Sequence, residues 1–478
     1  MGIPSFTVER TERTLKPRHW QSHLIQLLRA RLVQSEPGGH DVLVHAGPGA
    51  GKTIGALLSF QTLLRERRLD RFLVFCHRMS IAEQWQQAAS RLGLRLLPWD
   101  HTASLDPGGW DGQLISYQGA GRHRDRLQQL LPQLGLGRWL AIADEVHHLG
   151  LDPDEPEAAG WGHAFSQLTV GAQLRLGLTG TPFRADNLAF CAARRLRIQQ
   201  GDGFVEQIEP DLCVEPRQLI EQGDVRPLEF RFQDGWVDHG RRNQSEPLEP
   251  SPLSVEHRES WRARNLRRAI QLTDPSGIAR VLLQQARGQL EQVRVHHPGA
   301  AGMVVARDIA HARTVTDFLE AQGDRAMLVH SQAAEAPAAL AAFREGTADW
   351  LVSIDMCAEG FDAPRVRVVA YLTTVVTRSR FVQAITRAVR VDATRAALEE
   401  VPRHPSYIYA VADPLLISHA RGWSLREPYE VRARSLVEEG VPGQPGPPSR
   451  PLEALGERTG EIIRMKGPEL PSFLRRSA

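Results

Sequence analysis

Short apolar runs alternate with amphipathic helical stretches along most of the chain, and the alternation occurs twice. The first series predicts strands at residues 42–46, 72–76, 113–117, 139–143 and 174–179. The second series predicts strands at residues 303–306, 326–330, 350–354, 366–372 and 407–411. Because each run is almost continuously apolar, we expect parallel sheets covered by helices on both faces. The pattern therefore predicts two tandem α/β domains.

Composition changes along the chain suggest where these domains begin and end. Residues 244–254 (QSEPLEPSPLS) are rich in Pro, Ser and Glu and predict a flexible connection. A strand-like run at 228–232 precedes them, which places the domain boundary near residue 225. After about residue 425 the chain becomes rich in Pro and Gly, and we expect a short irregular C-terminal tail. The predicted division is an N-terminal extension 1–17, a first lobe 18–225, a second lobe 226–425 and a tail 426–478.

Composition narrows the class of protein. A chain of 478 residues is too long for one ordinary hydrophobic core. With 42% hydrophobic and 24% charged residues, it has the composition of a soluble globular protein. No apolar stretch approaches the roughly 18 residues of a membrane span, and the first ten residues lack the pattern of a secretory signal. The four cysteines are scattered, which argues against disulfides and structural zinc and favours a cytoplasmic location; they are Cys76, Cys191, Cys213 and Cys357.

The first predicted strand leads directly into a glycine-rich loop and then a helix. The loop reads A-x-x-x-x-G-K-T, the pattern of a phosphate-binding loop with Ala in the usual first Gly position. Its residues are Ala46, Gly47, Pro48, Gly49, Ala50, Gly51, Lys52 and Thr53. Only three of the 58 basic residues are lysine, and one of them is Lys52. We expect the backbone and Lys52 to bind the phosphates of ATP and the Thr53 hydroxyl to bind Mg²⁺.

The strand predicted at 139–143 ends in Asp144-Glu145-Val146-His147. Two adjacent carboxylates beside a phosphate-binding loop can divide the chemistry of hydrolysis. Asp144 would hold Mg²⁺, while Glu145 would orient and deprotonate the attacking water. A solvated acidic turn is the alternative, but the position after a buried strand favours a functional pair.

Further segments complete a known order of motifs. Residues 178–182 read LTGTP, residues 354–362 read IDMCAEGFD, and residues 383–390 read QAITRAVR. Together with GPGAGKT and DEVH, they resemble motifs I, II, III, V and VI of superfamily-two (DEVH-box) helicases and translocases. The resemblance covers roughly residues 18–412. Within the superfamily, these motifs are similar to those of the motor subunits of restriction enzymes and of repair translocases. It implies two RecA-like P-loop lobes with ATP bound in the cleft between them.

The resemblance assigns further roles where residues match. Gln21 resembles the adenine-reading glutamine ahead of motif I, with a polar position on an amphipathic helix as the alternative. Thr179 and Thr181 would bond near the catalytic His147, and Gly360 and Asp362 would approach the nucleotide from the second lobe. Arg387 and Arg390 would act as arginine fingers on the γ-phosphoryl oxygens. Thr386 stands where the family usually has glycine, although both arginines are present.

The near-neutral net charge of +2 does not by itself indicate a nucleic-acid partner. The segments that resemble the family's nucleic-acid track contain Arg78, Gln118 and Arg307, and these are the predicted phosphate contacts. Helix capping or surface solvation is the alternative for each of them. The arginine-rich stretch 257–268 could line a groove with Trp261 stacking, or form a solvated helix face whose Trp packs on the core.

The sequence thus predicts an ATP-dependent helicase or translocase acting on nucleic acid, with DNA favoured over RNA. The alternative is a nucleic-acid-stimulated ATPase switch or assembly subunit of a larger DNA-processing or defence complex, without unwinding activity. A small-molecule kinase would have no use for the DEVH, TGTP and motif VI segments together. Neither Lys16 nor Lys466 lies in a nuclease-like context, so a partner subunit would supply any nuclease activity. No membrane partner is expected.

Overall fold

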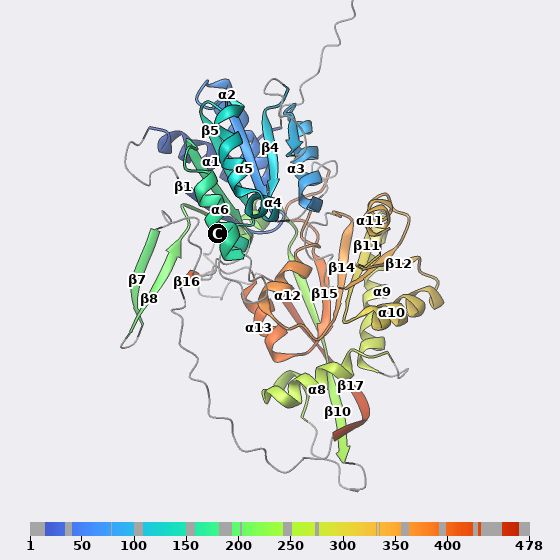
Figure 1. Ribbon diagram of the computed structural model, residues 1–478. Helices are drawn as coiled ribbons and strands as arrows, with labels where there is room; N and C mark the ends of the chain where they lie inside the picture. Colours follow the sequence, from blue (N-terminus) through green and yellow to red (C-terminus); the bar gives the residue numbers. More distant parts are fainter. Residues whose placement is uncertain are drawn as a thin grey trace, which may run out of the picture. The chain divides into compact units, whose positions relative to one another are not determined.

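The computed structural model describes residues 15–33, 41–77, 79–99, 109–149, 158–180, 194–200, 203–241, 251–272, 277–330, 332–333, 335–354, 363–391, 398–423, 429–431 and 452–467. These residues form two compact units, the first mainly from residues up to Cys213 and the second mainly from Val214 onward. Each unit is built around a seven-stranded sheet (Figure 1). In the part of the chain described, no helix combines the length and the apolar character that a membrane crossing requires.

The sheet of the first unit has the strand order β3-β4-β2-β5-β6-β1-β9. Its strands are β1 (Asp41–Ala46), β2 (Arg71–Cys76), β3 (Leu96–Pro98), β4 (Gly112–Ser116), β5 (Trp139–Asp144), β6 (Leu174–Thr179) and β9 (Leu212–Val214). The first six pair in parallel, with Val44 of β1 beside Leu178 of β6. Every residue of β5 is buried, which explains why its sequence is apolar on both faces.

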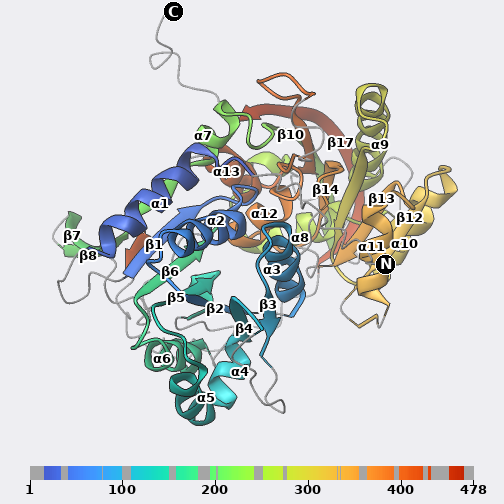
Figure 2. The same ribbon diagram turned by 90° about the horizontal axis from the view of Figure 1, so that it is seen from above.

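Helices cover both faces of this sheet. Figure 2 shows α1, α2 and α3 on one face and α4, α5 and α6 on the other. Their bounds are α1 His19–Arg31, α2 Lys52–Arg65, α3 Met79–Arg91, α4 Tyr117–Arg122, α5 Arg124–Leu130 and α6 Ala158–Leu168, with 3₁₀ turns η1 Leu131–Leu134 and η2 Val146–Leu149. The core of the second face includes Phe75 and Phe165, whose rings meet edge to face at 5.1 Å.

The sheet of the second unit has the order β12-β13-β11-β14-β15-β10-β17. Its strands are β10 (Leu228–Arg241), β11 (Ala301–Ala306), β12 (Ala326–Val329), β13 (Trp350–Ile354), β14 (Val366–Leu372), β15 (Ser406–Val411) and β17 (Leu452–Gly467). All neighbours from β12 to β10 pair in parallel, while β17 pairs antiparallel with β10. Gly302 of β11 leaves room for the buried Trp350 ring, because a Cβ at that position would collide with it.

The helices of the second unit bury an extensive apolar cluster against this sheet. α9 and α10 pack along its strands, and α12 packs beside α13 (Figure 1). The helices are α7 Pro216–Glu221, α8 Glu259–Ala269, α9 Ile278–His296, α10 Ile309–Ala321, α11 Ala336–Arg344, α12 Arg378–Ile385 and α13 Pro414–Gly422, with a 3₁₀ turn η4 Leu253–Val255. A separate three-stranded sheet joins β7 (Arg194–Gln200), β8 (Gly203–Glu209) and β16 (Tyr429–Val431).

All ten strands predicted from apolar runs are present, within two residues at each end. The boundary predicted at 225/226 falls between β9 of the first sheet and β10 of the second. At residues 251–254 the structure differs from the expected flexible connection. Leu253 is buried there, and Ser254 donates its hydroxyl to Asp234 at 2.6 Å. Both β10 and α8 on either side of the segment belong to the second unit.

The expectation of an irregular C-terminal tail is wrong for residues 452–467. They form β17, which pairs with β10 along almost its whole length. β17 is an edge strand, and most of its described side chains are exposed or half-buried. It therefore lacks the continuous apolar run by which the interior strands are recognised. The β10–β17 pair extends beyond the last residue of β10 that pairs with β15, Gln233, as a two-stranded ribbon.

Candidate functional site

The glycine-rich loop between β1 and α2 folds tightly at the start of the helix. Gly49 and Gly51 have φ angles of 80° and 81°, in the left-handed region that glycine adopts without a steric penalty. The Ala50 amide donates to the Gly47 carbonyl at 3.1 Å, and α2 begins at Lys52 immediately after the turn. The first amides of a helix have no acceptor within the helix, and the helix dipole favours negative charge there. This end of α2 is therefore suited to an anion.

Lys52 and Glu145 face each other beside this loop. The Lys52 ammonium lies 3.4 Å from Oε1 of Glu145, and only 12% of the Lys52 side chain is exposed. The other Glu145 oxygen, Oε2, accepts from the backbone amide of Gly180 at 3.2 Å. Glu145 has a φ angle of 48°, a left-handed conformation that is unusual for a residue with a side chain. The ends of three elements, α2, β5 and β6, thus converge on the Glu145 carboxylate.

Asp144 ends β5 and is buried directly beneath this pair. Its Oδ2 accepts from the Trp85 indole N–H at 2.7 Å, and its Oδ1 accepts from the Glu145 amide at 3.1 Å. Tyr117 donates its hydroxyl to the Asp144 backbone carbonyl at 2.8 Å. Burial, followed by the nearby Glu145 charge, raises the pKa of Asp144 to about 6, while the Trp85 bond and Lys52 lower it. A buried carboxylate held in this way is able to bind a cation.

Sequence reasoning did not single out Trp85 or Tyr117 as site residues. Trp85 lies on the buried face of α3. Tyr117 opens α4 and is also fully buried. Nothing in the sequence distinguishes either ring from an ordinary core aromatic, because only the fold shows that their polar atoms point to Asp144.

Gln21 is buried against the same loop. Its amide nitrogen Nε2 donates to the Gly51 carbonyl at 3.1 Å, and its Oε1 accepts from the Arg18 amide at 2.9 Å. The second bond is part of the N-terminal cap of α1. Gln21 therefore ties the start of α1 to the loop and is not a solvated position on a helix face. Base recognition by Gln21 stays a prediction.

In the second unit, the segment 383–390 that resembles motif VI begins in the last residues of α12. Arg387 is buried and Arg390 is half-buried, and both follow the end of this helix. Thr386 has a φ angle of −74°, so the backbone does not require glycine there. Its hydroxyl donates to the Val382 carbonyl at 2.6 Å, and the side chain is buried. The Thr386 side chain is thus accommodated in the position where the motif usually has glycine. Both arginines of the motif follow it in the sequence.

Several predicted site residues fall outside the described part of the chain. Arg78, Thr181, Gly360 and Asp362 are among them. The backbone of His147 belongs to η2, while the placement of its side chain is not described. The side chain of Thr53 lies in the first turn of α2 and is half-buried, and Thr179 is buried at the end of β6.

The predicted nucleic-acid contacts lie in separate elements. Gln118 is half-buried in the first turn of α4. The Arg307 guanidinium pairs with Asp308 at 2.6 Å, and Asp308 in turn caps α10 by accepting from the His311 amide at 2.8 Å. This arrangement gives Arg307 a local structural partner. A contact of Arg307 or Gln118 with nucleic acid stays a prediction.

The arginine-rich stretch 257–268 forms the start and body of α8. The Arg262 guanidinium donates to the buried Asp413 at 2.8 Å, and Arg268 lies 3.5 Å from the buried Glu457. The Arg258 guanidinium lies over the Trp261 ring at 5.0 Å from its centroid. Since part of the basic charge neutralises buried carboxylates, these contacts favour a structural helix over a groove lining.

Comparison with known proteins supports the two-lobe assignment. Residues 14–184 match the family model described as type III restriction enzyme, res subunit, and residues 286–392 match the helicase conserved C-terminal domain. These two regions of the chain are therefore similar to the corresponding domains of helicase-type proteins. A fragment assigned as the HsdR subunit of a type I restriction enzyme from Vibrio vulnificus superposes with a TM-score of 0.54 at 16% identity, covering 86% of this chain and 67% of that one. Both units accordingly have the RecA-like fold.

The chain also has longer relatives. It is 31% identical over 380 residues to an uncharacterised protein of Mycobacterium leprae, covering 78% of this chain and 59% of the relative. An uncharacterised protein of Mycobacterium tuberculosis is 31% identical over 359 residues, covering 73% of this chain and 56% of the relative. The chain therefore spans less than two thirds of the length of these curated relatives.

Proposed function

We propose that the chain hydrolyses ATP with Mg²⁺ in order to translocate along or unwind nucleic acid, with DNA favoured over RNA. One observation carries the proposal: the ends of α2, β5 and β6 bring Lys52, Glu145 and buried Asp144 together beside a left-handed glycine turn. The domain matches to a restriction-enzyme subunit and a helicase C-terminal domain support the same function.

The residues present fit a nucleoside triphosphate with its metal. The turn at Gly49 and Gly51 leads into the amino end of α2, and this arrangement suits phosphate oxygens. Asp144 supplies a buried carboxylate, and Thr53 a hydroxyl in the first turn of α2; these are the two ligand types expected for Mg²⁺ here. When bound, Mg²⁺ would neutralise charge on the phosphate oxygens.

Each side chain then has a defined task. Lys52 would turn from Glu145 to the phosphates, since a phosphate competes with a single carboxylate for the ammonium. Glu145 would remain fixed by the Gly180 amide, in position to orient and deprotonate a water molecule. Arg387 and Arg390 are proposed to stabilise charge on the transferred phosphoryl group, and His147, Gly360 and Asp362 keep the roles that the resemblance implies.

Steady-state ATP hydrolysis with single-stranded and double-stranded DNA and RNA tests the proposal. We expect turnover to rise with nucleic acid, most with DNA, and Lys52→Ala to abolish it. Lys466→Ala is the matched control, because it removes the same charge from an exposed position on β17. Turnover that survives Lys52→Ala would overturn the assignment of the phosphate-binding loop.

Strand displacement separates the proposed motor from its alternative. A helicase releases a labelled oligonucleotide from a duplex, and a double-strand translocase displaces a triplex-forming strand. Stimulated turnover with neither activity would instead identify an ATPase switch or an assembly subunit of a larger complex. The same assays with a candidate nuclease partner would show whether cutting depends on this chain.

A further inference from the structure

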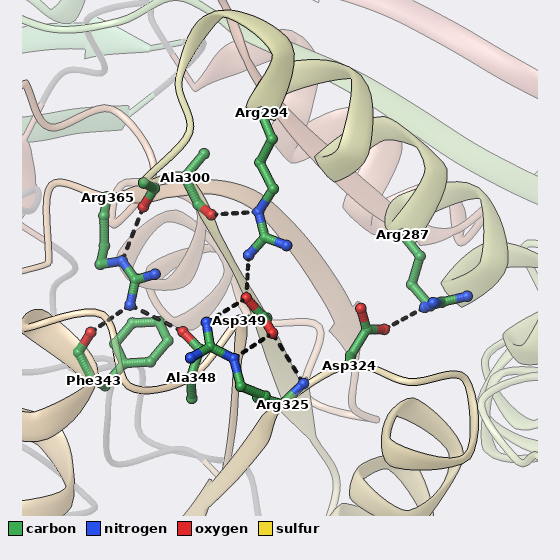
Figure 3. Close-up of polar contacts among 10 residues, drawn as sticks. Arg287, Arg294, Ala300, Asp324, Arg325, Phe343, Ala348, Asp349 and Arg365 are labelled. Carbon is green, nitrogen blue, oxygen red and sulfur yellow. Dashed lines mark hydrogen bonds and ion pairs between the residues drawn. The ribbon is translucent and has the colours of Figure 1, made fainter.

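The amino-terminal edge of the second sheet carries an unusual concentration of charged residues. Arg325, Asp349 and Arg365 each stand directly before a strand, β12, β13 and β14 respectively. In a parallel sheet these strand starts lie along one edge, and Figure 3 shows the three side chains gathered there with Arg294 of α9. The segment 354–362 that resembles motif V begins at the opposite end of β13, and Arg307 directly follows β11. At about 3.3 Å per residue, the six residues of β11 separate the two edges by roughly 17 Å.

A cavity of about 300 Å³ opens at this edge. We call it the arginine pocket. It is lined by six arginines against two carboxylates, Asp349 and Glu345, which leaves an excess of four positive charges. The arginines are Arg226, Arg294, Arg325, Arg344, Arg365 and Arg367. Glu399 lies next to the lining, where it pairs with Arg226 and lies 3.8 Å from Arg403. Because Glu399 and Arg403 carry opposite charges, including both of them leaves the excess of positive charge unchanged.

Two of the six arginines are held by neutral groups. Arg365 donates from Nε to the Gly299 carbonyl at 3.0 Å and from Nη1 to the Phe343 and Ala348 carbonyls at 2.6 and 3.0 Å. Arg367 donates to the Ser406 hydroxyl at 3.1 Å and to backbone carbonyls. Within the described residues, neither guanidinium has a carboxylate at ion-pair distance. Among the described residues, their guanidinium groups are held by neutral acceptors and not by a paired carboxylate.

Two further arginines, Arg294 and Arg325, are oriented by one shared carboxylate. Asp349 accepts from Arg294 at 2.7 Å and from Nε and Nη2 of Arg325 at 3.0 Å each (Figure 3). Two guanidiniums thus share a single negative charge. Burial and the Arg367 charge lower the pKa of the adjacent His297 to about 4, which agrees with a positive field in the pocket.

We propose that the arginine pocket binds a small phosphate-bearing ligand. Guanidinium groups from the starts of strands and from the helices α9 and α11 converge on it. Their forked donors match the several acceptor oxygens of a phosphate group. A cavity of this volume lies at the lower end of the range for small ligands, which favours a discrete anion over a polymer. The proposal does not depend on the proposed ATPase activity, because the pocket lies wholly within the second unit.

Calorimetric titration of the full chain with inorganic pyrophosphate tests the proposal. Lys52→Ala serves as the background, so that anion binding at the glycine-rich loop is weakened. We expect one binding site whose dissociation constant rises at least tenfold in Arg294→Gln, because a guanidinium is lost while Asp349 keeps its bonds from Arg325. The matched control is Arg287→Gln on the same helix, whose ion pair with Asp324 lies outside the lining (Figure 3). We expect it to change the constant less than twofold.

A second variant guards against misfolding of the first. Arg344→Glu reverses a charge on an exposed side chain at the end of α11, so the fold should persist while pyrophosphate affinity again falls at least tenfold. Parallel titrations with inorganic phosphate and with a phosphomonoester such as glycerol 3-phosphate distinguish a free inorganic anion from an organic phosphate.

Two outcomes would overturn the proposal. The first is no pyrophosphate binding to the Lys52→Ala chain. If single-stranded oligonucleotide binding is then lost in Arg294→Gln and Arg344→Glu, the pocket is assigned to nucleic acid. The second is equal loss of affinity in Arg294→Gln and Arg287→Gln.

Discussion

The Trp85 indole donates to the buried carboxylate of Asp144 at 2.7 Å, and this bond fixes the direction in which the carboxylate points. Trp85 itself is fully buried on α3, so the packing of the first unit determines the geometry of the candidate metal ligand. The opposite oxygen of Asp144 is held by the Glu145 amide. A residue of the apolar core therefore acts as a positioning residue for the proposed chemistry.

Trp85→Phe removes this donor and keeps an aromatic ring. We expect the free energy of unfolding to fall by about 1–3 kcal/mol, because a buried carboxylate oxygen loses its partner. The Mg²⁺ concentration for half-maximal ATP turnover should rise, because Asp144 is no longer held in one orientation. Trp139→Phe, which removes the same atom from a buried ring on β5, is the control. An unchanged Mg²⁺ dependence in Trp85→Phe would show that the bond is structural only.

Arg390→Ala should affect turnover far more than ATP affinity. A contact that strengthens in the transition state lowers kcat when it is lost and leaves ground-state binding nearly unchanged. We expect kcat to fall by about 10³-fold or more, which is the size of the effect of an arginine finger in phosphoryl transfer. The Kd of ATP should change by less than about threefold. Arg313→Ala on the exposed face of α10 should change neither quantity. A defect confined to ATP binding would assign Arg390 another role.

Thr386→Gly restores the residue that the family usually has at this position. Because the Thr386 backbone is already in a right-handed conformation and its hydroxyl bonds to Val382, we expect glycine to lower the free energy of unfolding by about 1–2 kcal/mol. Nucleic-acid-stimulated turnover should change less than twofold. Thr386→Ser, which keeps the hydroxyl, should lose less stability. A clear gain of turnover in the glycine variant would mean that Thr386 limits catalysis.

His297 makes the stability of the second unit depend on pH. Burial and the Arg367 charge lower the pKa of folded His297 from 6.5 to about 4. Between these two values the unfolded chain binds more protons at this residue than the folded chain does, so the free energy of unfolding should rise as the pH increases from about 4 to 6.5. Urea unfolding across this range should show a flatter dependence for His297→Asn than for the wild-type chain. The exposed His257→Asn is the control, and equal slopes in both variants would contradict the assignment.

The interior of the fold was predictable from the sequence because strands buried on both faces must be apolar throughout. The runs at 139–143 and 366–372 are examples, and they correspond to β5 and β14. The strands that were not predicted include β7 and β17. Each is the last strand of its sheet and carries charged residues at several positions. Their strand conformation depends on a partner strand, which a local pattern does not reveal.

The candidate site was predictable where chemistry fixes residue types in a short stretch of chain. Lys52 and Glu145 are such residues, and the structure brings them to 3.4 Å. The arginine pocket is the opposite case, because its residues range from Arg226 to Arg367 along the chain. Each of them reads as an ordinary surface arginine in a chain that has only three lysines. They converge because the amino ends of parallel strands share an edge, and because α9 and α11 bring Arg294 and Arg344 to the same edge.

The pairing of β17 with β10 also bears on how the protein is made. More than 200 residues separate the two strands, and the inner edge of β10 pairs with β15, which is also made much later than β10. At roughly 5–20 residues per second, a ribosome needs on the order of ten seconds or more to synthesise that interval. During this time β10 has no partner strand on either side, because β15 and β17 have not been synthesised. The strands β1 to β6 of the first sheet have already been made. A chaperone would therefore have an exposed strand to protect during the synthesis of the second lobe.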